Sequence, residues 1–285
     1  MKIFTKVIAL SLLIASGLSS GVLAQSIKMP PSSPTQTIKQ QFALSDISVS
    51  YSRPIAKGRQ IMGDLVPYGE IWRTGANAST KINFGEDVKI AGTNVPKGEY
   101  ALYTIPGKEE WTFILSKNTT LWGALGYKQE EDLLRFQAKT SALPNAVESF
   151  TIQFANVKPS SLAIELLWEK TSVSFTVNAE IDSRIMKQIE TAMGPTDRKP
   201  YLEAANYYFE SGKDLKQALE WATKATELSS PDQYWVEHLK AKIQLKMGDK
   251  KGAIASATSS MNKAKTQKNP DYVVLNEKLI AEAKK

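Results

Sequence analysis

Cysteine is absent from the 285-residue sequence, and histidine occurs only once, at position 238. Without cysteine the chain has no disulfide, no thiolate-bound zinc or iron–sulfur site and no cysteine nucleophile. A single histidine excludes a multi-histidine metal centre within one chain, and a Ser-His-Asp triad would depend entirely on His238. We therefore expect no catalytic residue, no metal site and no cofactor. An enzyme that uses two separated carboxylates stays an alternative.

The first 24 residues have the pattern of a secretory signal. Lys2 and Lys6 accompany a mostly apolar run from Val7 to Leu23, and Ala24 ends it as a small residue at a cleavage site. A retained membrane anchor is the alternative, but serine and glycine dilute the run below what a spanning helix needs. We expect cleavage after Ala24 and a periplasmic or secreted protein with no stable membrane span.

Positive charge is only slightly in excess, with 36 basic and 29 acidic residues and a formal charge of +7. Residues 25–180 hold 16 basic and 15 acidic side chains, whereas residues 181–285 hold 18 and 14. The basic excess of the second part is dispersed along helix patterns, and the export signal argues against a nucleic-acid partner. We expect no binding to nucleic acid.

Short apolar alternations predict a β domain at residues 36–180, after a flexible leader at residues 25–35. A hairpin is expected over residues 99–116, because Pro106-Gly107 is a strong turn signal between two apolar runs. Further strands are expected at residues 133–139, 149–154, 162–168 and 172–178, the last two as a second hairpin. The absence of intervening amphipathic helices indicates an antiparallel β-sandwich, with a jelly-roll-like barrel as the alternative.

From residue 181 the apolar period changes from two to about 3.6, which predicts helices. A connecting helix and linker occupy residues 181–198, and a helical domain occupies residues 199–285. Two helical hairpins turn at Gly212 and Gly248, a spacing close to the roughly 34-residue period of tetratricopeptide repeats. The fold class is thus α+β and multidomain, with a tetratricopeptide-like module. The repeats either bind a protein or peptide in a groove or only stabilise the chain.

A 25-residue stretch from Arg53 to Asn77 interrupts the strand pattern with four glycines and two prolines. Long ordered loops of compact domains are often functional. Guanidinium groups bind carboxylate or phosphate, tryptophan offers a stacking face, and asparagine both donates and accepts hydrogen bonds. The candidate ligand-binding residues are Tyr51, Arg53, Lys57, Arg59, Trp72, Arg73 and Asn77. They fit an anionic or glycan ligand, and the alternative is that they clamp the loop onto the sheet.

The same stretch resembles a known family. The runs Tyr51-Ser52-Arg53-Pro54, Leu65-Val66-Pro67-Tyr68-Gly69 and Trp72-Arg73-Thr74-Gly75-Ala76-Asn77 are similar to the signature of an exported bacterial family catalogued as domain of unknown function 2911. Later pieces, Gly98 to Pro106 and Trp122-Gly123, are similar too. The resemblance covers most of residues 36–179. It implies a small β-rich extracytoplasmic domain of Bacteroidetes-like bacteria, and it implies no reaction.

The sequence therefore favours a non-catalytic binding or scaffolding protein whose helical repeats contact a protein or peptide. The alternative is an enzyme or a small-ligand binder that acts on an anionic or glycan ligand through the Arg53–Asn77 loop. The tryptophans at 111, 122 and 168 are expected in the core rather than on a carbohydrate platform.

Overall fold

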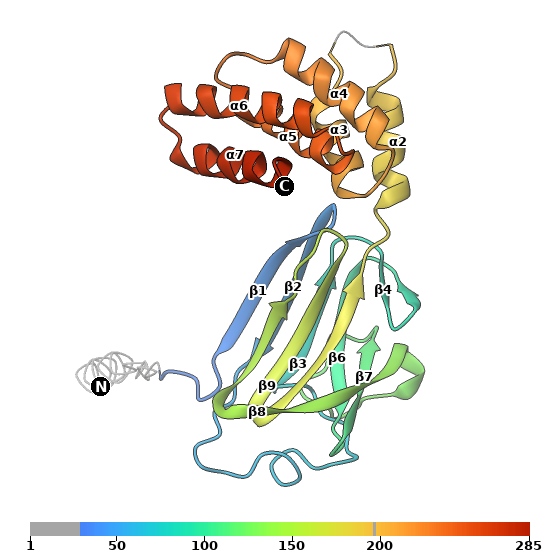
Figure 1. The fold of residues 1–285 in the computed structure, drawn as a ribbon. Helices are drawn as coiled ribbons and strands as arrows, with labels where there is room; N and C mark the ends of the chain where they lie inside the picture. Colours follow the sequence, from blue (N-terminus) through green and yellow to red (C-terminus); the bar gives the residue numbers. More distant parts are fainter. Residues whose placement is uncertain (1–28, 196–197) are drawn as a thin grey trace, which may run out of the picture. The chain divides into compact units, whose positions relative to one another are not determined.

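The computed structural model describes residues 29–195 and 198–285 (Figure 1). They form two compact units, a strand unit that ends at Ala179 and a helical unit that begins at Glu180. The predicted signal at residues 1–24 and the start of the predicted leader lie outside the described residues. No helix within the described ranges is long and apolar enough to cross a membrane.

The strand unit is built on an antiparallel sheet with the strand order β1-β2-β3-β6-β7-β8-β9-β4-β5 among the described residues. The strands are β1 (Thr35–Phe42), β2 (Ser45–Ser52), β3 (Ala76–Phe84), β4 (Val88–Ile90), β5 (Thr93–Val95), β6 (Gly98–Ile105), β7 (Glu110–Ser116), β8 (Asp132–Ala155) and β9 (Ser161–Asn178). A short 3₁₀ turn, η1 (Gln129–Glu131), precedes β8. The predicted hairpin is confirmed as β6 and β7. The α+β class is confirmed, and the jelly-roll-like barrel is wrong because the sheet is open between β1 and β5.

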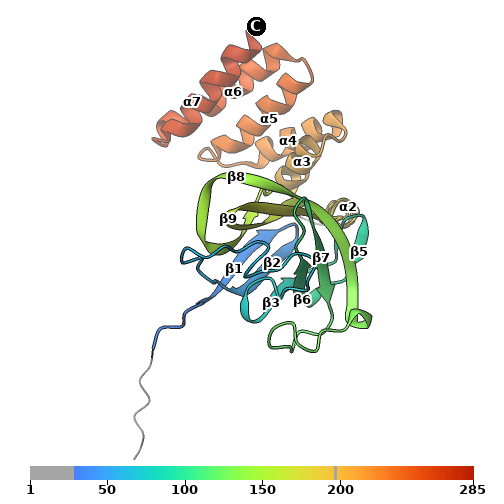
Figure 2. The ribbon, with the colours of Figure 1, turned by 90° about the horizontal axis from the view of Figure 1, so that it is seen from below.

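Two long strands fold the sheet over on itself. The first part of β8 pairs with β7, and from Thr140 onward β8 pairs with β9. Figure 2 shows β8 curving around the sheet between these two partners. The four short strands expected at residues 133–178 are therefore two continuous strands, and the second hairpin is wrong because its turn residues lie inside β9. The register of β8 against β9 shifts at two places, and each shift interrupts the apolar alternation in the sequence. The chain bends at these places but does not reverse, so an interruption that looks like a turn in the sequence lies inside a continuous strand.

The core lies between the two halves of this folded sheet. Tyr51, on β2, is buried, and its ring meets Phe150 of β8 edge-on at 5.8 Å. The Tyr51 hydroxyl accepts a hydrogen bond of 2.9 Å from the amide of Ile152. Its proton can go to the carbonyl of Ile152 at 3.2 Å or to Oε1 of Gln36 at 2.9 Å. One phenol thus satisfies backbone groups of β8 from the opposite half of the sheet.

The helical unit comprises α2 (Asp182–Ala192), α3 (Tyr201–Glu210), α4 (Leu215–Leu228), α5 (Tyr234–Lys246), α6 (Lys250–Thr266) and α7 (Pro270–Ala283) within the described residues. The turns α3–α4 and α5–α6 are built alike. Gly212 and Gly248 adopt φ of +66° and +85°, which only glycine tolerates without strain. The side chains of Asp214 and Asp249 then cap α4 and α6 by accepting backbone N–H bonds.

Small side chains let the helices of this unit approach closely. The small side chains of Ala218, Ala222 and Ala225 on α4 and of Ala253, Ala257 and Ser260 on α6 are all buried. Ala218 and Ala222 pack against Leu239 and Ile243 of α5. Larger side chains at these seams would overpack the interface.

We expect Tyr51→Phe to lower the free energy of unfolding by about 1–3 kcal/mol, because the Ile152 amide loses its buried acceptor. Chemical denaturation of the full chain measures this loss, and hydrogen exchange should become faster at the Ile152 amide. Tyr68→Phe is the matched control, since Tyr68 is 39% exposed. Equal stability of the two variants would contradict the role given to the Tyr51 hydroxyl.

Candidate functional site

The loop between β2 and β3 covers residues 53–75 (Figure 1). Backbone hydrogen bonds hold it to the sheet near both of its ends. Near its start, the Phe150 amide of β8 donates to the Pro54 carbonyl at 2.9 Å, and the Ala56 amide donates to the Glu148 carbonyl at 2.8 Å. Near its end, Trp72 and Thr104 of β6 exchange two bonds of 2.7 and 2.9 Å. The loop is therefore a fixed part of the strand unit.

The side chain of Trp72 packs into the core of the strand unit and fixes the loop there. Its ring stacks on Trp168 of β9, with centroids 6.0 Å apart and planes at 18°, and it meets Phe150 at 5.1 Å. The indole Nε1 donates to the Gly75 carbonyl at 3.0 Å. A Cβ at Gly75 would lie 3.0 Å from the Ser52 carbonyl oxygen, so the chain passes closely enough there to favour glycine.

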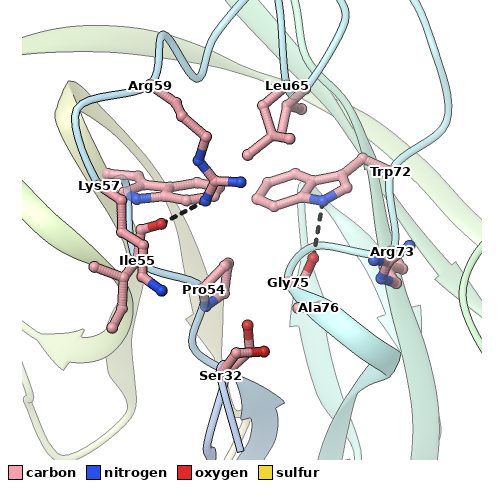
Figure 3. A pocket seen from close by; sticks show the side chains of 13 residues that line it. Ser32, Pro54, Ile55, Lys57, Arg59, Leu65, Trp72, Arg73, Gly75 and Ala76 are labelled. Atoms are coloured by element: carbon pink, nitrogen blue, oxygen red, sulfur yellow. Dashed lines mark hydrogen bonds between the residues drawn. The ribbon is translucent and has the colours of Figure 1, made fainter.

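A cavity of about 440 Å³ opens beside this pair of tryptophans (Figure 3). Its lining comprises Ser32, Ser33, Pro54, Ile55, Lys57, Arg59, Leu65, Val66, Trp72, Arg73, Gly75, Ala76 and Trp168. Figure 3 shows the Arg59 guanidinium and the Leu65 side chain reaching toward the Trp72 indole. Among the described residues, the lining includes three cationic side chains and no carboxylate.

Four of the seven residues proposed from sequence line this cavity: Lys57, Arg59, Trp72 and Arg73. Within the cavity, Arg59 serves two purposes. Its Nε donates to the Ala56 carbonyl at 2.9 Å and its Nη2 to the Ile55 carbonyl at 2.6 Å, so the guanidinium is fixed by its own loop. A guanidinium has five N–H donors, and the ones that remain are available to the cavity.

The other three proposed residues, Tyr51, Arg53 and Asn77, do not line the cavity. Arg53 donates from Nε to the Phe150 carbonyl at 3.1 Å and from Nη2 to Thr151 Oγ1 at 2.8 Å. Asn77 donates from Nδ2 to the Ser33 carbonyl at 3.2 Å. These side chains hold neighbouring segments together, and Asn77 does so for a segment that forms one wall of the cavity.

Among the described residues no acidic side chain lines the cavity, although two carboxylates bond to backbone amides of its loop. Glu148 accepts a hydrogen bond from the backbone amide of Lys57 at 2.8 Å, and Glu169 accepts one from the amide of Ile61 at 3.2 Å. Within the described chain, the Lys57 ammonium makes no ion pair or hydrogen bond. Arg73 also lines the cavity, and its Nε is buried without a partner in the described structure, whereas its Nη1 lies near Gly123. Figure 3 shows the Arg73 side chain apart from Arg59 and Lys57, so we assign the anionic group of a ligand to these two cations.

Sequence reasoning missed the two serines and Trp168. Ser32 and Ser33 belong to the predicted leader, and Trp168 belongs to a strand, so no local pattern joins either to the loop. Trp111 and Trp168 are buried as expected, whereas the expectation for Trp122 is wrong, since it is 75% exposed. Trp122 lies in the connection between β7 and β8, where the chain forms no strand to turn it inward.

The helical unit carries a second concave surface, of about 640 Å³, which we call the lysine groove. It is lined by Phe209, His238, Lys242, Leu245, Lys246, Lys250, Leu275, Lys278, Leu279, Glu282 and Lys285. The ammonium groups of Lys242 and Lys246 lie 4.7 and 4.8 Å from the centroid of the Phe209 ring. Lys242 also pairs with Glu210 at 3.0 Å.

The His238 imidazole lines this groove and bonds to a side chain of α7. Its Nδ1 lies 2.8 Å from Oδ1 of Asn276, whose Nδ2 donates to Ser260 Oγ and to the Tyr272 carbonyl. The Asn276 oxygen is therefore the acceptor and His238 Nδ1 carries the proton. Burial lowers the pKa of His238 below its ordinary value, despite the opposing effect of its hydrogen bond to Asn276.

The described residues contain no cluster of three histidine, aspartate or glutamate side chains that could hold a metal ion. A family model described as Protein of unknown function (DUF2911) matches residues 33–177. The match includes every loop residue proposed from sequence and ends before the helical unit. No curated protein and no solved structure matches the chain.

The depressed pKa of His238 makes stability depend on pH. The unfolded state binds a proton near pH 6.5 while the folded state resists it, so the stability contributed by the neutral imidazole is complete above pH 6.5 and is lost as the pH falls through the lower folded pKa. We expect the difference in free energy of unfolding between the wild type and His238→Asn to shrink from pH 7.5 to pH 5. Denaturant titrations at several pH values measure it, and a constant difference would refute the assignment.

Proposed function

Because the chain belongs to the DUF2911 family, whose description names no reaction, we propose its function from its surfaces: it is an exported, non-catalytic binding protein whose lysine groove holds an acidic peptide segment of a protein partner. The observation that carries this proposal is the composition of the groove. Five lysines and several apolar side chains share it with a single carboxylate, that of Glu282, among the described residues.

Export is supported by the N-terminal pattern of a basic start, an apolar run and a small residue at position 24. We expect the mature protein purified from its native cell envelope to begin at Gln25, as read by mass spectrometry of its N-terminal peptide. A full-length N-terminus recovered from the cell envelope would favour a retained anchor, and recovery from the cytoplasm would refute export.

The lysine groove is formed by four helices of the unit. Phe209 comes from α3, His238 to Lys246 come from α5, Lys250 begins α6, and Leu275 to Glu282 come from α7. Buried alanines from successive helices, such as Ala205, Ala222, Ala241 and Ala257, pack these helices closely together, which supports the tetratricopeptide-like interpretation. The lysines of the groove lie outside these clusters, so the packing of the helices does not use them, and this supports a groove that binds rather than only packs.

Charge and apolar exposure together define the partner. Lys250, Lys278 and Lys285 make no ion pair within the described part of the chain, so their ammonium groups are free to meet carboxylates. Leu275 is 44% exposed and lies among them. An acidic segment with at least one apolar side chain would neutralise the lysines and cover the leucine. Such a segment would contact several helices at once, as peptides do when they bind in a groove between helices.

We expect a fluorescent peptide of aspartates and glutamates with one central leucine to bind the full chain, and a matched lysine-rich peptide not to bind. Fluorescence anisotropy measures both. Because the contacts are exposed ion pairs, affinity should fall as salt rises from 50 to 300 mM. The double variant Lys250→Gln, Lys278→Gln should weaken binding by about 5- to 10-fold, from roughly 1 kcal/mol in all.

Lys216→Gln is the matched control, since Lys216 lies on α4 outside the groove. It should leave the affinity unchanged, and circular dichroism should show that all variants keep their helices. Equal binding of the acidic and basic peptides, or equal weakening by the control, would refute the groove as the binding surface.

A further inference from the structure

We infer that the cavity beside Trp72 is a second, independent binding site, which takes a small organic anion consisting of one carboxylate or phosphate group attached to a ring. The cavity lies entirely in the strand unit, and the lysine groove lies entirely in the helical unit. Success or failure of one proposal therefore leaves the other untouched.

The anionic group is assigned to Lys57 and Arg59. The Arg59 guanidinium is already fixed by two carbonyls of its own loop, so little side-chain entropy is lost when it binds a ligand. The Lys57 ammonium makes no ion pair in the described chain, and Glu148 bonds to the Lys57 backbone amide rather than to the ammonium. A bound anion would give this ammonium a direct ionic partner.

The ring is assigned to the apolar wall. Leu65 is 45% exposed although it borders a cavity, which leaves a large apolar side chain uncovered in the free protein. The Trp72 indole lies across from it in Figure 3, with its Nε1 already donated to Gly75. Trp72 therefore offers a ring surface rather than a hydrogen bond, and a planar ring or the C–H face of a sugar fits against such a surface.

Size and the remaining polar groups set the class of molecule. A cavity of about 440 Å³ falls within the usual range for small-ligand sites and is too small for a folded partner. Ser32 and Ser33 add hydroxyl groups on the wall formed by the leader segment. Aromatic carboxylates and acidic sugars share the required chemistry of one anion on one ring, and the experiment separates them.

The test is isothermal titration calorimetry of the full mature chain with benzoate, D-glucuronate and D-glucose 6-phosphate. Inorganic phosphate is the probe that lacks the ring, and D-glucose is the probe that lacks the charge. We expect at least one ring-bearing anion to bind at least about tenfold more tightly than phosphate and glucose, since anion and ring each contribute. The tightest probe identifies the ring as aromatic or saccharide.

Three variants place the binding in the cavity. Lys57→Gln should weaken the tightest probe by about 5- to 10-fold without unfolding the protein, because the Lys57 side chain has no internal partner. Leu65→Ser should weaken binding of the same probe, because its ring loses an apolar contact, and it should leave the binding of inorganic phosphate unchanged. Lys117→Gln is the charge-matched control on the strand unit outside the cavity. Absence of binding by all three ring anions up to 10 mM, or equal weakening by Lys57→Gln and Lys117→Gln, would overturn the inference.

Discussion

The packing of Trp72 on Trp168 is the contact on which the arrangement of the strand unit depends. It joins the β2–β3 loop to β9, two segments far apart in sequence, and it is reinforced by Phe150 of β8. The Trp72 backbone also pairs with Thr104 of β6, so both the side chain and the main chain fix the loop to the sheet at this residue. The cavity follows from this geometry, since the indole fills the core with one side and borders the cavity with the other.

The helical unit was predictable in detail because its signals are local. Gly212 and Gly248 mark turns through their positive φ, and the aspartates that follow each glycine cap the next helix. The strand unit was predictable in class and in its β6–β7 hairpin, since Pro106-Gly107 is also a local signal. The continuity of β8 and β9 through their bends was not predictable, because a register shift and a turn interrupt the apolar alternation of a sequence in the same way.

The candidate site shows why a cluster in sequence is not a cluster in space. Arg53 and Arg59 are close in the chain, yet the Arg53 side chain donates to the Phe150 carbonyl of β8, and of the two only Arg59 lines the cavity. The sequence offers a clamp and a ligand site as alternatives. For Arg59 the two are compatible, since a guanidinium held by two carbonyls stays in one orientation and keeps further N–H donors. A burial pattern alone would not have revealed this.

One wall of the cavity comes from Ser32 and Ser33, ahead of the first strand, and it is held by Asn77 and by the Arg53 amide, which donates to the Pro34 carbonyl at 2.9 Å. Hydrogen bonds of this kind close the cavity with a segment that belongs to no strand. Expression design should respect this, because a purification tag fused close to residue 32, or a truncation that starts the protein at β1, would change the shape of the cavity while leaving the sheet intact. A C-terminal tag avoids that alteration.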